Sequence, residues 1–162
     1  MQAYIRSLWP DRRGPGVNDP APADTSGIHL DIHSFSQLVL WPWGETNAPA
    51  PNGTAMQTMG RRLAFFNGYT PEQSIGLYPT DGTSDAPSYG ELGVASFTIE
   101  LGQAFFESCT SYNNSTKPLN LPALNVRVAD MLDALEAVAG PQVRALVRFE
   151  KDPRIADIVA RW

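Results

Sequence analysis

The stretch GIHLDIHSFSQLVLWPWG, residues 27–44, decides how this chain folds. Its first half alternates apolar side chains with histidine or aspartate from Ile28 to His33. This period of two predicts a half-buried strand whose polar side chains share one face. The second half, Leu38–Trp43, is a short apolar run that Pro42 and Gly44 end.

Outward from this stretch, a second alternating segment, Val94–Leu101, predicts another strand with Glu100 at its end, on the polar face. Apolar residues recur at helical spacing from Met56 to Phe66, with Thr54 as the expected cap and Gly68 as the stop. The other expected segments are an irregular loop over 9–26, a buried strand at Ile75–Tyr78, a polar loop at Thr80–Ala86 and a short helix at Tyr89–Leu92. Strands separated by helices predict an α/β fold, a partial mixed sheet layered by helices.

Composition narrows the function classes. The 162 residues are 43% apolar and 18% charged, which is typical of a globular domain with a sizeable core. A net charge of −5 offers no basic surface for nucleic acid. We expect neither a membrane span nor a signal peptide, because no apolar run approaches the roughly 20 residues that a spanning helix needs. A single cysteine, Cys109, excludes an internal disulfide.

We expect two regions, 1–120 and 121–162. The sequence of the second region predicts a helix–strand–helix tail. A helix carries apolar residues on one face between Val128 and Val138, a strand follows at 143–149, and Asp152 with Pro153 begins a last helix.

Few side chains in this sequence suit catalysis. His29 and His33 are the only histidines and share one strand face, so they are either metal ligands or polar residues on a sheet edge. Glu100 is either a general base or a solvated strand end, and Tyr78 is either a mobile binding residue or an aromatic at the rim. The chain contains no His-Glu-x-x-His, Gly-x-Ser-x-Gly, Gly-x-Gly-x-x-Gly or Walker motif.

Two ordered motifs resemble the pancreatic-type zinc carboxypeptidases and their bacterial relatives. LDIHSFSQLVLWPWG, residues 30–44, resembles the motif of the third metal ligand, and SFTIEL, residues 96–101, resembles the strand of the catalytic glutamate. Tyr78 precedes Glu100 by 22 residues, as the mobile substrate-binding tyrosine does in this family. Gly82–Asp85 is similar to the specificity loop. The resemblance covers residues 4 to 124.

The resemblance implies a peptidase that removes C-terminal residues from peptides. His33 would bind zinc, Glu100 would activate the metal-bound water, and Tyr78 would close over the terminal carboxylate of the peptide. Zinc lowers the pKa of bound water towards about 7, and a carboxylate can then take the proton and return it to the leaving amine. Membership would also imply an extracellular location.

Further positions carry over with some departures. Asp85 would face the C-terminal side chain and favour Lys or Arg, although Ala86–Pro87 replaces the usual acidic and aromatic pair. Ser34 and Phe35 would contact the peptide, with Phe35 in place of a common tyrosine. The bonds Ser34–Phe35 and Pro42–Trp43 match places where the family has cis peptides.

The family's first two zinc ligands form a His-x-x-Glu pair that residues 1–27 do not contain. Arg12 and Arg13 match neither of the family's substrate-binding arginine motifs. We therefore expect a truncated carboxypeptidase that is inactive alone, because one imidazole binds zinc weakly. The alternatives are a non-catalytic peptide- or protein-binding domain and a chimeric fragment without function.

Two further expectations concern the ends of the resemblance. After 120–124, the tail resembles the C-terminus of extended short-chain sugar-acid (erythronate-type) dehydrogenases, without their cofactor motif. A natural fusion, a gene-model error and an artificial chimera would each give a junction near Asn120. A sheet edge left open would promote self-association.

Overall fold

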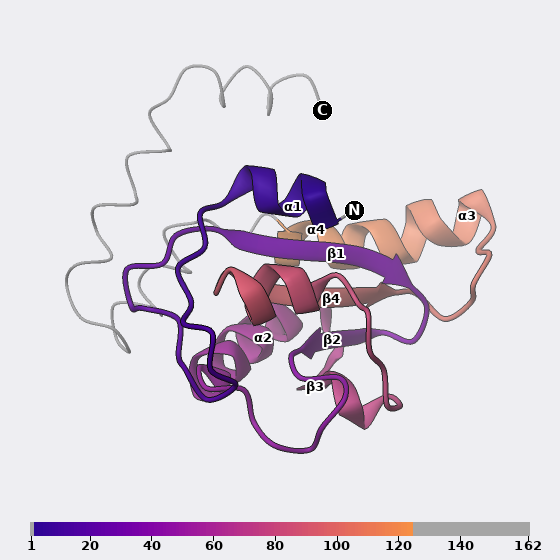
Figure 1. Ribbon diagram of the computed structural model, residues 1–162. Helices are drawn as coiled ribbons and strands as arrows, with labels where there is room; N and C mark the ends of the chain where they lie inside the picture. Colours follow the sequence, from indigo (N-terminus) through magenta and orange to yellow (C-terminus); the bar gives the residue numbers. More distant parts are fainter. Residues whose placement is uncertain (1, 125–162) are drawn as a thin grey trace. The chain divides into compact units, whose positions relative to one another are not determined.

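The computed structural model describes residues 2–124 (Figure 1). These residues belong to the first of two units into which the chain divides, Met1–Val126. The second unit, Arg127–Trp162, lies outside the described residues, as do the predicted helix–strand–helix tail and its dehydrogenase-like segment.

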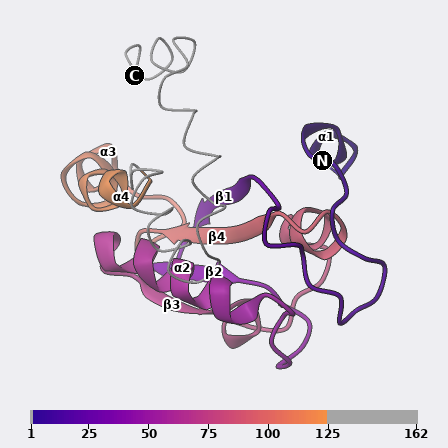
Figure 2. The ribbon, with the colours of Figure 1, turned by 90° about the vertical axis from the view of Figure 1, so that its left-hand side faces the viewer.

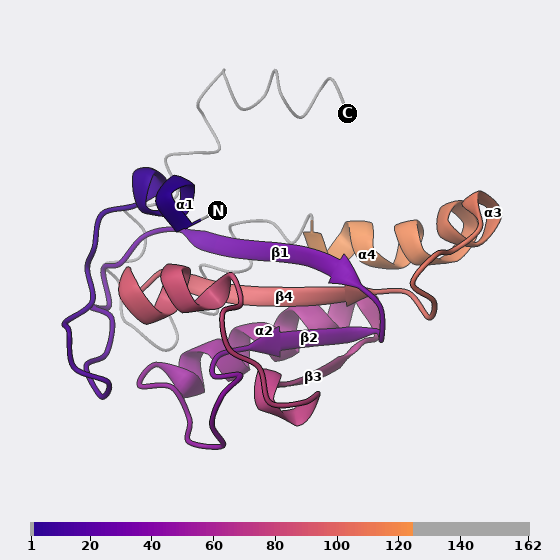
Figure 3. The same ribbon diagram turned by 45° about the vertical axis from the view of Figure 1, so that its right-hand side comes forward.

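A four-stranded mixed sheet organises the described residues, in the order β1-β4-β2-β3. The strands are β1 (Ile28–Ser34), β2 (Leu38–Trp41), β3 (Thr70–Gln73) and β4 (Ala95–Leu101). β4 runs parallel to β1 and antiparallel to β2, and β2 runs parallel to β3 (Figure 3). The predicted α/β fold with a mixed sheet and layered helices is confirmed.

Helices cover both faces of this sheet. They are α1 (Gln2–Leu8), α2 (Gly53–Asn67), a 3-10 turn (Ser74–Gly76), a π-helix (Ala86–Glu91), α3 (Cys109–Ser111), a second π-helix (Tyr112–Thr116) and α4 (Lys117–Leu124). α2 and α4 lie on one face of the sheet and the π-helix 86–91 lies on the other (Figures 1 and 2). None of the helices within residues 2–124 is long and apolar enough to cross a membrane.

The core lies between the sheet and α2. Val39, Phe97 and Ile99 of the central strands are fully buried, as is Leu63 of α2, the helix that packs against β2. α2 approaches β2 closely at Gly60, where a Cβ atom would lie 2.6 Å from the ring of Trp41. A glycine at this point lets the helix and the strand pack together.

Three predicted elements need correction. Ile75–Tyr78 is not a strand: β3 lies earlier, at 70–73, and a 3-10 turn follows it. The polar sequence of β3 hid it, but β3 is an edge strand, where Pro71 is tolerated. The side-chain amide of Gln73 also donates to the backbone carbonyls of Trp43, Thr46 and Ala48. These bonds hold β3 in place.

The start of α2 and the short helix near 89 also differ from expectation. α2 begins at Gly53 after Asn52, not at Thr54. The side chain of Asn52 does not cap the helix, because it bonds to the backbone of Ala21 and to the hydroxyl of Tyr89. The short helix is a π-helix that starts at 86, and Gly68 ends α2 in the left-handed conformation, as predicted.

Candidate active site

The site begins with two neighbouring parallel strands. β1 and β4 lie side by side (Figure 3), and their register pairs His33 with Glu100 and His29 with Ser96. Because parallel strands end at the same edge, His33 and Glu100 come together at the C-terminal ends of β1 and β4, and α/β sheets commonly bind ligands at the carboxyl ends of such strands.

His33 and Glu100 form a half-open pair. The imidazole Nδ1 of His33 lies 3.6 Å from Oε1 of Glu100, and the side chain of His33 is 60% exposed. Nδ1 also lies 3.2 Å from the carbonyl oxygen of Ser34. Glu100 is only 8% exposed, and its Oε2 has no hydrogen-bond partner among the described residues. Glu100 is therefore not a solvated strand end.

Burial changes the acidity of this carboxyl group. Desolvation raises the pKa of Glu100 above its ordinary value, and the nearby charge of Asp31 adds to the rise. The imidazole of His33 opposes both effects by favouring the charged form. A carboxylate with a raised pKa is a stronger base than an ordinary one, which suits a group that accepts a proton and later returns it.

His29 belongs to a different environment. Its Nδ1 lies 2.6 Å from the hydroxyl of Ser88 and 3.4 Å from that of Ser96. Four residues along a strand separate side chains by about 13 Å, too far for His29 and His33 to bind one ion. His29 fits the second interpretation, a polar residue of the edge strand with partners of its own.

The other predicted residues are placed less closely together. Tyr78 is 60% exposed in the loop after the 3-10 turn, and Phe35 is 44% exposed just beyond β1. Asp85 is buried and directly precedes the π-helix 86–91. Ser34 ends β1 and accepts the bond from His33 through its main chain. The bonds Ser34–Phe35 and Pro42–Trp43 are cis, as the resemblance implied.

Two polar contacts of the site were not foreseen. Ser84 donates to the carboxylate of Asp31 at 2.5 Å, and Ser88 bonds to His29, so the π-helix is tied to the polar face of β1. The four-residue spacing of the two serines is a helical signal, but the sequence places no helix at that point. Only the fold shows which strand they face.

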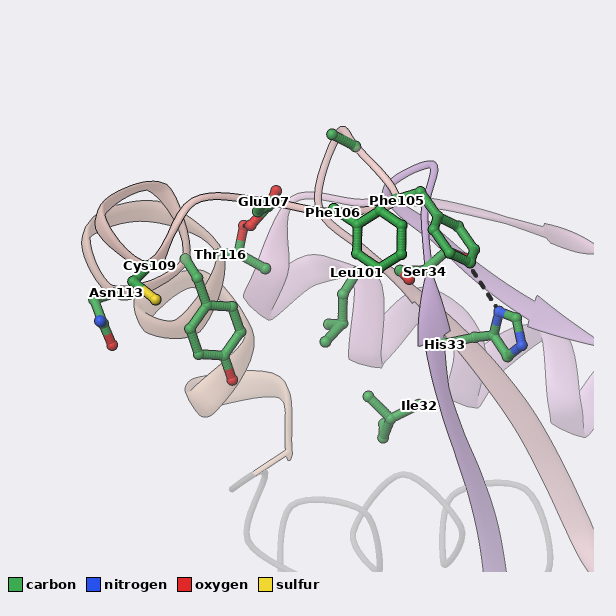
Figure 4. A pocket seen from close by; sticks show the side chains of 12 residues that line it. Ile32, His33, Ser34, Leu101, Phe105, Phe106, Glu107, Cys109, Asn113 and Thr116 are labelled. Atoms are coloured by element: carbon green, nitrogen blue, oxygen red, sulfur yellow. Dashed lines mark hydrogen bonds between the residues drawn. The ribbon is translucent and has the colours of Figure 1, made fainter.

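A cavity of about 640 Å³ lies beside His33, which is one of the residues that line it (Figure 4). Its walls are mainly apolar, with Ile32 and Leu101 from the strands and Phe105 and Phe106 from the following loop. Phe106 is 89% exposed. This cavity could not be predicted from the sequence, because its walls come from segments about 70 residues apart.

Zinc does not fit the described residues alone. Within residues 2–124, no three His, Cys, Asp or Glu side chains converge to hold a metal. The pair supplies one imidazole and one carboxylate, whereas catalytic zinc sites use three protein ligands and an open position. The described side chains therefore offer one candidate ligand, His33, and not a complete site.

The fold and the site together define an α/β protein with a buried glutamate beside a histidine, where two parallel strands of a mixed sheet end. Residues 22–114 match the zinc carboxypeptidase family, and the chain belongs to this family. A zinc carboxypeptidase of Saccharothrix mutabilis subsp. capreolus is 42% identical over 79 residues, which make up 45% of this chain and 18% of that protein.

Solved structures show the same fold. Thrombin activatable fibrinolysis inhibitor matches with a TM-score of 0.51 and 20% identity, over 68% of this chain and 28% of that one. Carboxypeptidase A of Helicoverpa armigera matches with a TM-score of 0.53 and 17% identity, over 70% and 31%. Bovine thrombin-activatable fibrinolysis inhibitor, solved in complex with tick carboxypeptidase inhibitor, matches with a TM-score of 0.51 and 19% identity. This match covers 65% of this chain and 38% of that one. This chain thus spans less than two fifths of each protein.

Proposed function

We propose that this chain forms the glutamate-bearing part of a zinc carboxypeptidase active site and does not hydrolyse peptides on its own. One observation carries the proposal. Glu100 is buried, its Oε2 has no hydrogen-bond partner among residues 2–124, and its Oε1 lies 3.6 Å from Nδ1 of His33, where β1 and β4 end. A buried carboxylate oxygen without a hydrogen-bond partner costs free energy, and such groups are typical of functional sites.

The proposed chemistry of Glu100 is proton transfer. Its raised pKa suits a group that takes a proton from the attacking water and gives one to the leaving amine. Zinc would supply polarisation of the scissile carbonyl in a complete site of this family. His33 is the proposed ligand from this chain, and further ligands would come from outside residues 2–124.

The proposed substrate is the C-terminal end of a peptide. Tyr78, in an exposed loop, would cover the terminal carboxylate, and Ser34 and Phe35 would contact the chain beyond β1. Asp85 would face the last side chain and favour Lys or Arg, because a buried carboxylate attracts a cationic partner. The burial of Asp85 supports this assignment.

The first experiment is a zinc titration of the metal-stripped chain by calorimetry. We expect no tight binding, because one imidazole supplies too little affinity. His33→Ala is the matched variant and His29→Ala the control, since His29 is held by Ser88 and Ser96. Tight one-to-one binding that only His33→Ala removes would contradict the expected inactivity and would justify a peptidase assay.

A second candidate is a peptide-binding domain without catalysis. The lack of three converging ligands within residues 2–124 favours it. It predicts that peptides bind equally well with and without a chelator and are recovered uncut. Binding that a chelator abolishes would exclude this candidate.

A further inference from the structure

Arg13 is a buried cation held by main-chain oxygens. It is 9% exposed, and four of its hydrogen bonds go to backbone carbonyls. Nε donates to Asp19 at 2.8 Å, Nη1 to Gly90 at 2.5 Å, and Nη2 to Gly16 at 3.2 Å and Val17 at 2.8 Å. No carboxylate of the described residues forms an ion pair with it.

Two aromatic rings complete this environment. The Cζ atom of Arg13 lies 5.5 Å from the ring centres of both Trp43 and Tyr89. A buried charge is costly unless its hydrogen bonds are made, and aromatic faces add cation–π attraction. The carbonyls and rings together therefore stabilise the guanidinium of Arg13 in the place of a carboxylate partner.

The guanidinium joins two segments that are far apart in sequence. Gly16, Val17 and Asp19 lie in the loop 9–26, and Gly90 lies in the π-helix 86–91, 77 residues from Arg13. The main chain makes a second link beside it, from the amide of Arg12 to the carbonyl of Leu92. This part of the loop is therefore bound to the C-terminal end of the helix.

The other end of the same helix reaches the candidate active site. Asp85 precedes its first residue, Ser84 bonds to Asp31 of β1, and Ser88 bonds to His29. The bonds of Gly90 and Ser84 thus hold this short helix near both of its ends. Fixing its end at Gly90 therefore also fixes the position of Asp85 relative to β1.

We propose that Arg13 is a positioning residue: its buried guanidinium holds the π-helix 86–91 through the carbonyl of Gly90 and so sets the place of Asp85. Its effect on peptide selectivity rests on the proposed function. Arg13 touches no substrate in this scheme. Its fork of planar donors suits four carbonyls, a geometry that the single ammonium of lysine does not reproduce.

Hydrogen exchange on the full chain tests the clamp itself. In Arg13→Ala we expect at least tenfold faster amide exchange over residues 84–92, with α2 unchanged, and recovery when guanidinium ion is added at millimolar levels. In Arg13→Lys, we expect added guanidinium ion to restore slow amide exchange over residues 84–92 less than it does in Arg13→Ala. Arg12→Ala is the matched control, since Arg12 makes an exposed ion pair with Asp24 through its side chain. Unchanged exchange over 84–92, or equal acceleration in α2, would overturn the proposal.

Peptide binding tests the consequence for the site. Two peptides that differ only in a C-terminal Lys or Leu are titrated against the wild type and Arg13→Lys. We expect the preference for Lys to fall about fivefold in the variant and to persist in Arg12→Lys. An unchanged ratio would refute the link to Asp85. Failure of the wild type to bind either peptide would reject the proposed function instead, while the exchange experiment would still decide the clamp.

Discussion

At the scale of single residues, Glu100 carries a cost of folding that depends on pH. Its pKa is raised in the folded chain, mainly by burial. Below the ordinary value of 4.5 both states hold the proton and the cost vanishes. As pH rises above this value, Glu100 loses its proton more easily in the unfolded chain than in the folded chain. The free energy of unfolding therefore falls until the pH passes the pKa of Glu100 in the folded chain.

Replacing this carboxyl group should therefore stabilise the metal-stripped chain. We expect Glu100→Gln to raise the free energy of unfolding by about 1 kcal/mol at pH 8 and to leave it unchanged near pH 3.5. Urea unfolding at the two pH values measures this. Glu91→Gln is a control of opposite sign, because the hydrogen bond from Arg6 lowers the pKa of Glu91. A loss of stability in Glu100→Gln at pH 8 would contradict the assigned cause.

At the scale of elements, the contact between α2 and β2 depends on Gly60. Ala is favoured over Gly in a helix by about 1 kcal/mol, but its Cβ would lie 2.6 Å from Trp41. Overpacking costs about 1–3 kcal/mol, so we expect Gly60→Ala to destabilise the fold by about 1 kcal/mol. Thermal unfolding measures the change. Thr58→Ala, at an exposed position of the same helix, should instead be neutral or stabilising.

The tie between α2 and α4 is a buried polar network. The amide of Asn120 donates to the hydroxyl of Tyr69 and to the carbonyl of Thr116, and its oxygen accepts from Asn67. We expect Asn120→Ala to cost about 2 kcal/mol, because it leaves these buried groups without partners. Chemical denaturation tests this, with the exposed Leu119→Ala as control. An equal effect of both substitutions would show that the network adds nothing. The predicted junction residue Asn120 thus packs within the described body.

At the scale of the whole molecule, the open edge of β1 is the feature most open to association. Within residues 2–124, β1 pairs only with β4, and Ile32 is 44% exposed beside the apolar cavity. Unpaired edges with apolar neighbours promote association. We predict concentration-dependent oligomers in sedimentation velocity, reduced by Ile32→Lys and not by Phe65→Lys on α2. A monomer at all concentrations would contradict this prediction.

The sequence carries the motifs of the carboxypeptidase family, and by itself it determined the strands predicted at 28–33 and 94–101 and the helix stop at Gly68. These follow from local rules, because alternation, helical spacing and glycine at a helix end depend on neighbouring residues only. The strand β3 was missed, since an edge strand can be polar and its place depends on pairing with β2.

Only the tertiary structure decided how the site is assembled. His33 and Glu100, 67 positions apart in the sequence, come together because β1 and β4 pair in parallel, and burial then raises the pKa of the carboxyl group of Glu100. The tertiary structure also brought Ser88 to His29 and joined Arg13 to Gly90 across 77 residues. Sequence spacing gives the residue types, whereas pairing register and burial set their distances and charges.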